Sequence, residues 1–413
     1  MRALRFILAG TFVFLQFIPS AHAEDPDILV KDGKFFGEMR YRYEHVEQNG
    51  VFENANANTI RLNLGFKTGT YRGFSGLIEQ QLVQSLGKDD FNSLDNGQTS
   101  FPTVADPDVA QINQLWVSYT GLPSTEIKVG RQGININNQR FLGTVAWRQN
   151  DQTFDAVTVA NNSIQNLSVQ YGYVRRVNRI FGGSVPPDHL IGHTHYINLS
   201  YDFKPWLKAS GYGYWMGFDN AASLSNKTFG LRLTGEEPVC SNWTFFYEAE
   251  AAKQYDHGKN TADYDEEYYH LEPGIKGYGF VFKAGYEELG GNGTNAFQTP
   301  LATLHKYNGW ADKFLTTPAN GLEDSYLSAS YNISNVQDII DGVSLGATYH
   351  DFRGNKGGDY GSEVDLSLQK TFALPTGQPF ENIDVLFKFA DYDAEDTPFT
   401  DTQKFWFQLG TKF

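Results

Sequence analysis

Cysteine is nearly absent from this sequence: Cys240 is the only one in 413 residues. A single thiol excludes an intramolecular disulfide and any zinc or iron–sulfur centre built from cysteines. Basic residues are also in deficit, because 33 Lys and Arg stand against 48 Asp and Glu, a net charge of −15 at pH 7. Nucleic acid is bound through a clustered basic surface, so this charge argues against a nucleic-acid partner. Long apolar runs are missing too, since no segment after residue 23 has the ~18 consecutive apolar residues of a membrane helix.

Aromatic side chains, by contrast, are abundant. The chain contains 32 Phe, 23 Tyr and 7 Trp, although its mean hydropathy is only −0.43. This combination is expected where strands cross a membrane and only every second side chain faces lipid. The composition therefore favours a membrane β-barrel.

Residues 1–23 have the layout of a secretory signal peptide. Arg2 and Arg5 supply the positive start, an apolar stretch follows from Phe6 to Ile18, and Ala21 to Ala23 form an A-x-A cleavage site. A transmembrane anchor is the alternative, but the apolar stretch is too short to cross a hydrocarbon layer ~30 Å thick. We expect residues 24–413 to form one mature domain outside the cytoplasm.

Apolar and polar residues alternate in repeated runs, for example over 35–44, 60–67, 229–234 and 383–390. Runs of about ten residues suit a tilted strand that crosses the hydrocarbon layer. A soluble β-sandwich also alternates, so the connections must decide. Short connections near 68–70, 121–123, 161–163 and 204–205 are interspersed with long polar loops near 85–109, 132–151, 176–193, 255–263 and 288–322. This rhythm is typical of the periplasmic turns and extracellular loops of outer-membrane barrels.

We therefore predict an all-β fold: a transmembrane antiparallel up-and-down barrel of about 18 strands with long extracellular loops, in the outer membrane of a Gram-negative bacterium. An even number of strands places both termini on the periplasmic side. The strands are expected near 34–46, 58–67, 71–84, 111–120, 124–131, 153–160, 164–175, 194–203, 206–217, 226–234, 242–254, 264–275, 279–287, 323–333, 342–350, 360–372, 382–391 and 401–412.

The last strand ends on an aromatic residue. Phe405, Phe407, Leu409, Thr411 and the terminal Phe413 share one face. An alternating final strand with a C-terminal aromatic resembles the signal read by the outer-membrane assembly machinery. We expect that machinery to be a partner through Phe413, and lipid and lipopolysaccharide to surround the barrel.

Two stretches resemble the alginate-export family of outer-membrane barrels. The first runs from Val129-Gly130-Arg131-Gln132 through Asn138-Gln139-Arg140-Phe141-Leu142-Gly143 and Trp147-Arg148-Gln149-Asn150 to Thr153-Phe154-Asp155-Ala156-Val157. The second comprises Phe297-Gln298-Thr299-Pro300-Leu301-Ala302-Thr303-Leu304-His305 and Tyr307-Asn308-Gly309-Trp310-Ala311-Asp312-Lys313-Phe314. The resemblance implies an 18-stranded barrel with infolded loops that carries an anionic polysaccharide or a similar solute.

The alternation also predicts which charged residues face the lumen. Arg40, Arg42 and Arg61 are the main candidates for anion contact, because a guanidinium binds a carboxylate bidentately. Alternatively, Arg and Glu on adjacent strands pair with each other and fill a polar lumen. The inward-facing set on the first two strands is Glu38, Arg40, Arg42, Glu44, Arg61 and Lys67. Later strands add the basic residues Arg232, Lys283, Lys388 and Lys404 and an acidic group of Glu248, Glu250, Glu266, Glu272, Glu287, Glu363, Asp365 and Asp384.

Further candidates lie in or beside long loops. Arg131 precedes the polar segment 132–151, and Arg140 and Arg148 lie within it; we expect this segment to fold inward as a constriction. It is otherwise a surface loop, and in either case one arginine can hold it to the wall through Asp151 or Asp155. His305, Tyr307 and Trp310 belong to the longest loop, whose apolar face is expected over the pore mouth or the rim. The rings of Tyr307 and Trp310 either stack on sugars or anchor the rim.

The leading hypothesis is a passive channel for alginate-like anionic polysaccharide or other small acidic solutes. Alternatives are a general diffusion porin, or the barrel of an export or conduit complex with periplasmic export partners at the turn 334–341. An outer-membrane hydrolase is less favoured, since only Ser184 with His189, His193 or His195 offers a nucleophile near a base. We predict no catalytic residue, no metal site and no cofactor, and without an ATP-binding loop transport follows a gradient.

Overall fold

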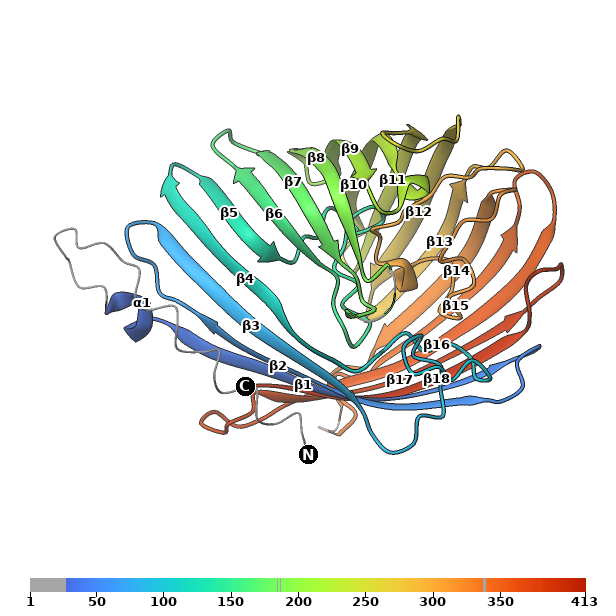
Figure 1. Cartoon of the computed structure of the whole chain (residues 1–413), viewed down its shortest axis with the longest axis horizontal. Coiled ribbons are helices and arrows are strands. Elements are labelled where there is room, and N and C mark those ends of the chain that lie inside the picture. The colour runs from blue at the N-terminus through green and yellow to red at the C-terminus, as the bar shows by residue number, and fades with distance from the viewer. Residues whose placement is uncertain (1–26, 184, 186, 337–338) are drawn as a thin grey trace.

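The computed structural model describes residues 27–183, 185, 187–336 and 339–413, so the predicted signal peptide lies outside the described residues. These residues form one ring of eighteen antiparallel strands (Figure 1). A short helix, α1 (Ile28–Lys31), precedes the ring, and two 3-10 turns, η2 (Ala222–Leu224) and η3 (Leu304–Lys306), lie in loops. The strands are β1 (Lys34–Gln48), β2 (Ala55–Lys67), β3 (Phe74–Ser85), β4 (Val109–Leu122), β5 (Thr125–Gln132), β6 (Thr153–Asn161), β7 (Leu167–Asn178), β8 (His189–Lys204), β9 (Leu207–Phe218), β10 (Asn226–Cys240), β11 (Trp243–Asp256), β12 (Asp265–Gly277), β13 (Phe280–Leu289), β14 (Leu322–Asn332), β15 (Ser344–Arg353), β16 (Asp359–Ala373), β17 (Asn382–Asp393) and β18 (Thr402–Lys412).

Each strand pairs with its neighbours in sequence, and β1 also pairs with β18, from Glu38 opposite Lys412 to Gln48 opposite Thr402. The closed ring leaves no strand edge unpaired, as a sheet in hydrocarbon requires, because no water is present there to satisfy free amides. The predicted fold class is confirmed, and each predicted strand overlaps an observed one. Residues 235–240, which fall between two predicted strands, instead continue β10 against β11 beyond the apolar alternation.

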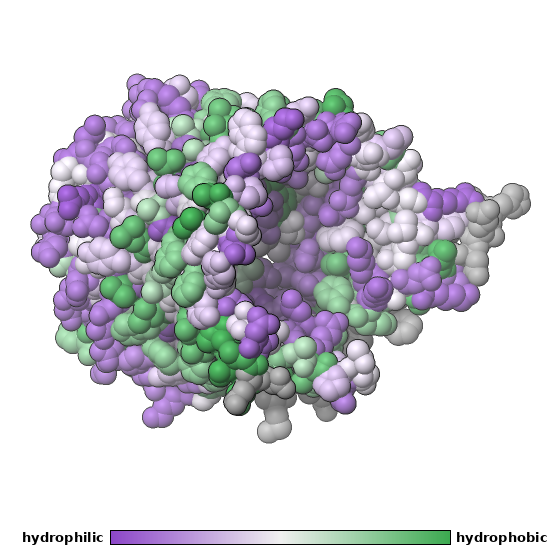
Figure 2. Space-filling view, turned by 180° about the vertical axis from the view of Figure 1, so that it is seen from behind, coloured by the Kyte–Doolittle hydropathy of each residue, from purple (hydrophilic) through white to green (hydrophobic). Residues whose placement is uncertain are grey.

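The alternation of β1 matches its environment. Phe35 and Met39 are exposed on the outer face, whereas Arg42 and Glu44 are fully buried toward the interior. Exposed apolar side chains recur at outward positions of the other strands, such as Leu231 and Leu327. Figure 2 shows apolar residues spread over the outer face of the wall and a hollow that opens into the ring. Among the described residues, none of the helices has the length and hydropathy needed to cross a membrane.

Phe413 joins the last strand to the first. Its backbone exchanges two hydrogen bonds with Gly37, at 2.8 and 3.0 Å. Its ring lies directly over Gly37, where any Cβ would meet the ring at 2.2 Å. This fit explains a glycine in the apolar row of β1. Recognition of Phe413 by the assembly machinery stays a prediction.

The hydrophobic core lies between the wall and long extracellular loops that fold into the ring. Phe141, from the loop 133–152, packs against Tyr212, Tyr214, Tyr268 and Phe297 with ring centroids 5.3–5.9 Å apart. A second cluster joins Phe91 and Val104 of the loop 86–108 to Val46, Ala55 and Ala57 on the wall. Burying each large apolar side chain contributes roughly 1.5–3 kcal/mol, so these loops are held inside by packing.

Candidate pore constriction

Two long loops, 133–152 and 290–321, meet inside the barrel and are together called the plug. Leu142 and Leu301 form a parallel bridge between them. The amide of Gly143 donates to the carbonyl of Leu301 at 2.9 Å, and the amide of Thr303 donates to Gln139 at 3.1 Å. The predicted infolding of 132–151 is therefore seen, and the second long loop is its partner.

Arg40 and Arg42 hold the plug through its backbone. The guanidinium of Arg40 donates to the carbonyls of Ala146 and Arg148 at 3.0 and 2.5 Å and to Gln149 Oε1 at 2.9 Å. Arg42 donates to the carbonyl of Trp147 at 2.6 Å and lies 4.0 Å from the centroid of the Trp147 ring. Both arginines are buried. The plug segment 146–149 therefore occupies the guanidinium groups that we predicted to bind anions.

Arg61 and Arg131 are also paired within the protein. Arg61 bonds to Glu38 and lies 3.2 Å from Asp151 of the plug. Arg131 lies 2.8 Å from Asp155 on the adjacent strand β6. These contacts agree with the alternative interpretation, in which lumen charges pair and hold the loop. Anion contact by Arg40, Arg42 or Arg61 stays a prediction.

Lys67 and Arg232 lie elsewhere in the lumen. Lys67 is exposed at the periplasmic end of β2, opposite Lys34. Arg232 on β10 forms an ion pair with Glu248 on β11, and the same carboxylate accepts a hydrogen bond from Asn138 of the plug at 2.6 Å. The two predicted pore-lining cations therefore differ: one is open to solvent, and the other supports the plug.

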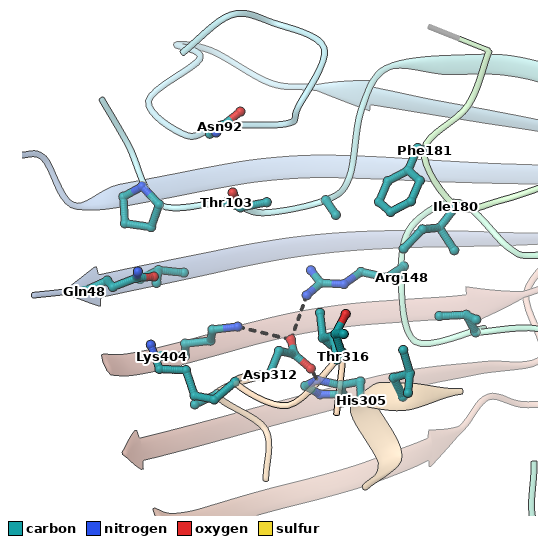
Figure 3. A pocket seen from close by; sticks show the side chains of 18 of the residues that line it. Gln48, Asn92, Thr103, Arg148, Ile180, Phe181, His305, Asp312, Thr316 and Lys404 are labelled. Atoms are coloured by element: carbon teal, nitrogen blue, oxygen red, sulfur yellow. Dashed lines mark hydrogen bonds and ion pairs between the residues drawn. The ribbon is translucent and has the colours of Figure 1, made fainter. Parts of the chain in front are cut away.

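Asp312 connects the two loops of the plug to each other and to β18. Its Oδ2 lies 2.9 Å from Arg148 Nη2 and 3.1 Å from Lys404 Nζ, and its Oδ1 lies 2.8 Å from His305 Nδ1 (Figure 3). Arg148 also reaches Glu44 on β1 at 3.2 Å. Burial alone would raise the pKa of Asp312, but His305, Lys404 and Arg148 hold it well below its ordinary value. The carboxylate is therefore charged and fully neutralised by protein cations.

His305 is a neutral link in the same network. Its Nε2 lies 2.8 Å from Lys388 Nζ, which has only donors, so Nε2 accepts and the ring proton lies on Nδ1, toward Asp312. Burial lowers the pKa of His305 well below its ordinary value; Lys388 and Arg148 lower it further, while Asp312 opposes them. The ring stacks on Trp147 with centroids 4.5 Å apart.

The aromatic residues of the second loop are covered by protein cations. Lys388 Nζ lies 3.5 Å from the centroid of the Trp310 ring, and the Arg140 guanidinium lies 4.7 Å from that of Tyr307. Arg140 bonds to Glu287 on β13 at 2.8 Å and to Thr299 at 3.1 Å. Trp310 and Tyr307 therefore lie inside the plug instead of anchoring the rim, and their predicted stacking on sugars stays untested.

Two carboxyl groups of β16 receive the plug backbone. Glu363 accepts a hydrogen bond from the amide of Ala311 at 2.7 Å, and Asp365 accepts one from the amide of Trp310 at 3.2 Å. Gly309 has φ +81°, and a Cβ there would meet Glu363 Oε2 at 2.3 Å, so only glycine fits. The sequence marked these carboxylates as inward-facing, but the role of binding a loop was missed because nothing local signals it.

The plug separates two chambers of opposite charge. The outer chamber has a volume of about 740 Å³ and is lined mostly by loops; its lining contains one acid, Asp312, the cations Arg148, Arg179, Lys313 and Lys404, and the neutral His305. The inner chamber, about 300 Å³, lies against the inward side chains of β11–β16. Its acids, Glu248, Glu272, Glu287, Asp324 and Asp365, face His270, Lys283, Lys306 and His350. Sequence analysis missed Arg179 and Lys313, because loop position alone does not show which loop cations face the lumen.

Of the proposed hydrolase group, the structure describes the histidines. Ser184 lies outside the described residues. His193 and His195 bond to Tyr173 and Tyr171 at 2.8 and 2.9 Å on the outer face of the barrel. Over the same described residues, no group of three or more His, Cys, Asp and Glu is arranged to hold a metal ion.

A closed ring of eighteen strands with a lipid-facing exterior, a polar interior and infolded loops defines an outer-membrane channel. The family model described as alginate export matches residues 34–289, more than half of the chain, and the chain belongs to this family. A search of curated proteins returns no match.

Solved outer-membrane porins share the fold. Acinetobacter baumannii OccAB2 is 15% identical with a TM-score of 0.72, over 94% of this chain and 99% of that one. Pseudomonas aeruginosa OccK3 (OpdO) is 13% identical with a TM-score of 0.70, over 94% and 97% of the two chains. P. aeruginosa OpdK, solved with vanillate, is 14% identical with a TM-score of 0.70, over 93% and 99%. Identities this low show a common fold and leave the solute open.

Proposed function

We propose that this outer-membrane channel passes acidic solutes, alginate-like acidic sugars included, passively down their gradient. The observation that carries the proposal is the charge of the outer chamber, whose lining has four cations, Arg148, Arg179, Lys313 and Lys404, and a single carboxylate, Asp312. A lumen wall of one sign raises the local concentration of solutes of the other sign and speeds their entry.

The plug restricts what passes. Its two loops are joined to each other and fixed to β1, β13, β16 and β18 by Arg40, Arg140, Glu363 and Lys404. A channel narrowed by such fixed loops selects by size as well as charge. An extended polysaccharide chain therefore requires the plug to move, whereas a small acid requires less.

The general diffusion porin remains the second candidate, because a specific feature favours it. The inner chamber is rich in carboxylates, and a solute that crosses both chambers meets fields of opposite sign. If the acidic chamber dominates the energy barrier, the channel is weakly selective or prefers cations.

Reversal potentials in planar bilayers under a salt gradient test the proposal. We expect the protein to form conducting pores that prefer anions. The double variant Arg179→Gln/Lys313→Gln should reduce that preference, because both cations line the outer chamber. The matched control is Lys253→Gln, which removes a cation from an ion pair with Asp265 on the outer face. A cation-selective pore whose reversal potential does not change in Arg179→Gln/Lys313→Gln contradicts the proposal.

A further inference from the structure

The outer face of the barrel carries opposite charges on two of its walls. The difference lies at the extracellular ends of the strands, on the outward positions beside the lipid headgroups. Over β12–β17 these positions are mostly acidic, among them Glu267, Glu288, Glu323, Asp351 and Asp391. Over β7–β11 they carry Arg175, His193, His195, Lys227 and Lys253. Figure 1 shows β7–β9 and β14–β17 on different sides of the ring.

The outward direction of these side chains follows from the burial of their neighbours. Lys227 lies between two side chains that are each 1% exposed, and His195 lies between two that are 2–3% exposed. On the other wall, Asp391 lies between two side chains that have no exposed surface. Because successive side chains of a strand point to opposite faces, the three charged or titratable groups face away from the lumen.

The strand register aligns five outward residues of the first wall in one row. From β7 to β11 the row consists of Tyr173, His195, Trp215, Lys227 and Tyr255, each directly opposite the next. Trp215 packs edge-on against Phe229, with ring centroids 5.3 Å apart, and Phe229 is exposed one step deeper in the apolar band. Aromatic rings gather at the level of the headgroups, so the row lies at the border between lipid tails and polar surface.

The row offers hydrogen-bond donors to a ligand outside the barrel. Among the described residues, no carboxylate lies at ion-pair distance from Lys227, whose amine is 5.4 Å from the centroid of the Tyr255 ring. His193 and His195 use Nδ1 for tyrosine hydroxyls at 2.8 and 2.9 Å. When each hydroxyl donates to Nδ1, the proton of a neutral imidazole lies on Nε2, which can then donate to an anion.

Two further cations lie above the row at the extracellular margin. Arg175 and Lys259 lie 3.5 and 2.9 Å from the same carboxylate, Asp219, so this group of three keeps one net positive charge. Lys253, beside the acidic wall, is paired with Asp265 at 2.7 Å. We call Arg175, His193, His195, Lys227 and Lys259 the basic patch.

We propose that the basic patch binds the phosphate groups of a phosphorylated glycolipid of the outer leaflet, of the lipid A class. A phosphate accepts charge-assisted hydrogen bonds from ammonium, guanidinium and imidazole groups at headgroup level. Beneath the patch, Phe229 and Leu231 are exposed toward lipid and offer a surface for the acyl chains. A free anion has no chains to cover that surface, so the lipid is the favoured occupant.

This inference concerns the outside of the barrel and goes beyond the proposed function, because it does not depend on which solute the lumen passes. The acidic wall repels the same phosphates, so the glycolipid is held on one side of the ring only. That wall therefore supplies a matched control. Arg353, at the extracellular end of β15, pairs with Asp351 at 2.9 Å, and removing its charge leaves the basic patch intact.

Native mass spectrometry of the purified barrel in detergent tests the site by counting bound lipids. The probes are diphosphoryl lipid A, the same lipid without its phosphates, and phosphatidylglycerol. We expect diphosphoryl lipid A to bind at least about tenfold more tightly than the other two, because its phosphate monoesters accept the most charged hydrogen bonds. Inorganic phosphate at equal concentration should displace little of it, since the acyl chains also contribute.

Two sets of changes locate the bound lipid. Lys227→Gln should weaken lipid A binding about fivefold, the upper end for a partly exposed ion pair. His193→Phe/His195→Phe keeps aromatic rings but removes the donors, and it should weaken binding by a similar factor. Arg353→Gln should change nothing, and unheated mobility in SDS gels verifies that each variant is folded.

Four outcomes would overturn the inference. Equal binding of phosphate-free lipid A would show that apolar contact alone holds the lipid, and equal binding of phosphatidylglycerol would assign the patch to anionic phospholipids. Full displacement by an equal concentration of inorganic phosphate would make the occupant a free anion. Binding that neither patch variant alters, or that Arg353→Gln weakens as much, would place the lipid elsewhere. None of these results depends on the ion preference of the pore.

Discussion

The two chambers are parts of one lumen, yet their charges come from different kinds of structure. The outer chamber takes three of its cations, Arg148, Arg179 and Lys313, from loops. The inner chamber takes all five of its acids from strands. The barrel wall therefore sets the charge where the lumen is lined by strands, and infolded loops replace that charge where they cover it.

The arginines of β1 show how completely the loops replace the wall. Arg42 has none of its surface exposed, and Arg40 is 7% exposed, because the backbone of 146–148 accepts their hydrogen bonds. Lys313 and Arg179 are only half-buried and line the chamber. In this lumen the burial of a cation, more than its presence on an inward position, decides whether a solute meets it.

The largest effect is expected from Arg40→Ala/Arg42→Ala. Each charged hydrogen bond contributes about 1.5–3 kcal/mol, and the double variant removes those that hold the loop 133–152 to β1. We expect a larger and noisier single-channel conductance with the anion preference retained, because the outer-chamber cations remain. Planar-bilayer recordings measure both quantities.

The same variant also tests the alternative that Arg40 and Arg42 contact the solute directly. In that case the anion preference falls while the conductance stays near that of the parent protein. Arg131→Ala is a matched control, because Arg131 pairs with Asp155 between neighbouring strands and does not hold the plug backbone. It should leave both quantities unchanged.

How much of this the sequence can predict follows from the range of the interactions. Alternation is local, so the strands, their number and the inward positions of Arg40, Glu363 and Asp365 follow from it. The partners are not local: Arg140 meets Glu287 across 147 positions, and His305 meets Lys388 across 83. The family resemblance points to the loops 133–152 and 290–321. Only the fold shows that these loops bind each other and that the first of them accepts the hydrogen bonds of Arg40 and Arg42.

An intermediate effect is expected from acid, acting through His305. Its neighbours are Asp312 on its own loop, Arg148 and Trp147 on the other loop of the plug, Lys388 on β17 and Lys404 on β18. Because the closed plug depresses the pKa of His305, an open state binds the proton more readily. The free energy that favours the closed plug therefore has its full value above the ordinary pKa near 6.5. It falls by about 1.4 kcal/mol for each pH unit below that value.

Single-channel recordings between pH 7.5 and 4.5 measure this loss as more frequent openings in acid. His305→Gln keeps one donor and one acceptor but does not titrate, so its openings should depend less on pH than those of the parent protein. An equal pH dependence in the variant would assign the effect to other groups, and would leave the plug closed by contacts that acid does not reach.

The smallest effect is expected from Glu272→Gln in the inner chamber. Glu272 pairs with Lys283 at 3.1 Å and accepts a hydrogen bond from Tyr326 at 2.7 Å, which the amide preserves. Because Lys283 is partly exposed, the pair contributes only about 0.2–1 kcal/mol, and the fold should be unaffected. Removing one negative charge should raise the anion preference slightly, opposite in sign to Lys313→Gln. A reversal potential that moves the same way in both variants would show that the two chambers do not act as opposing charges on one permeation path.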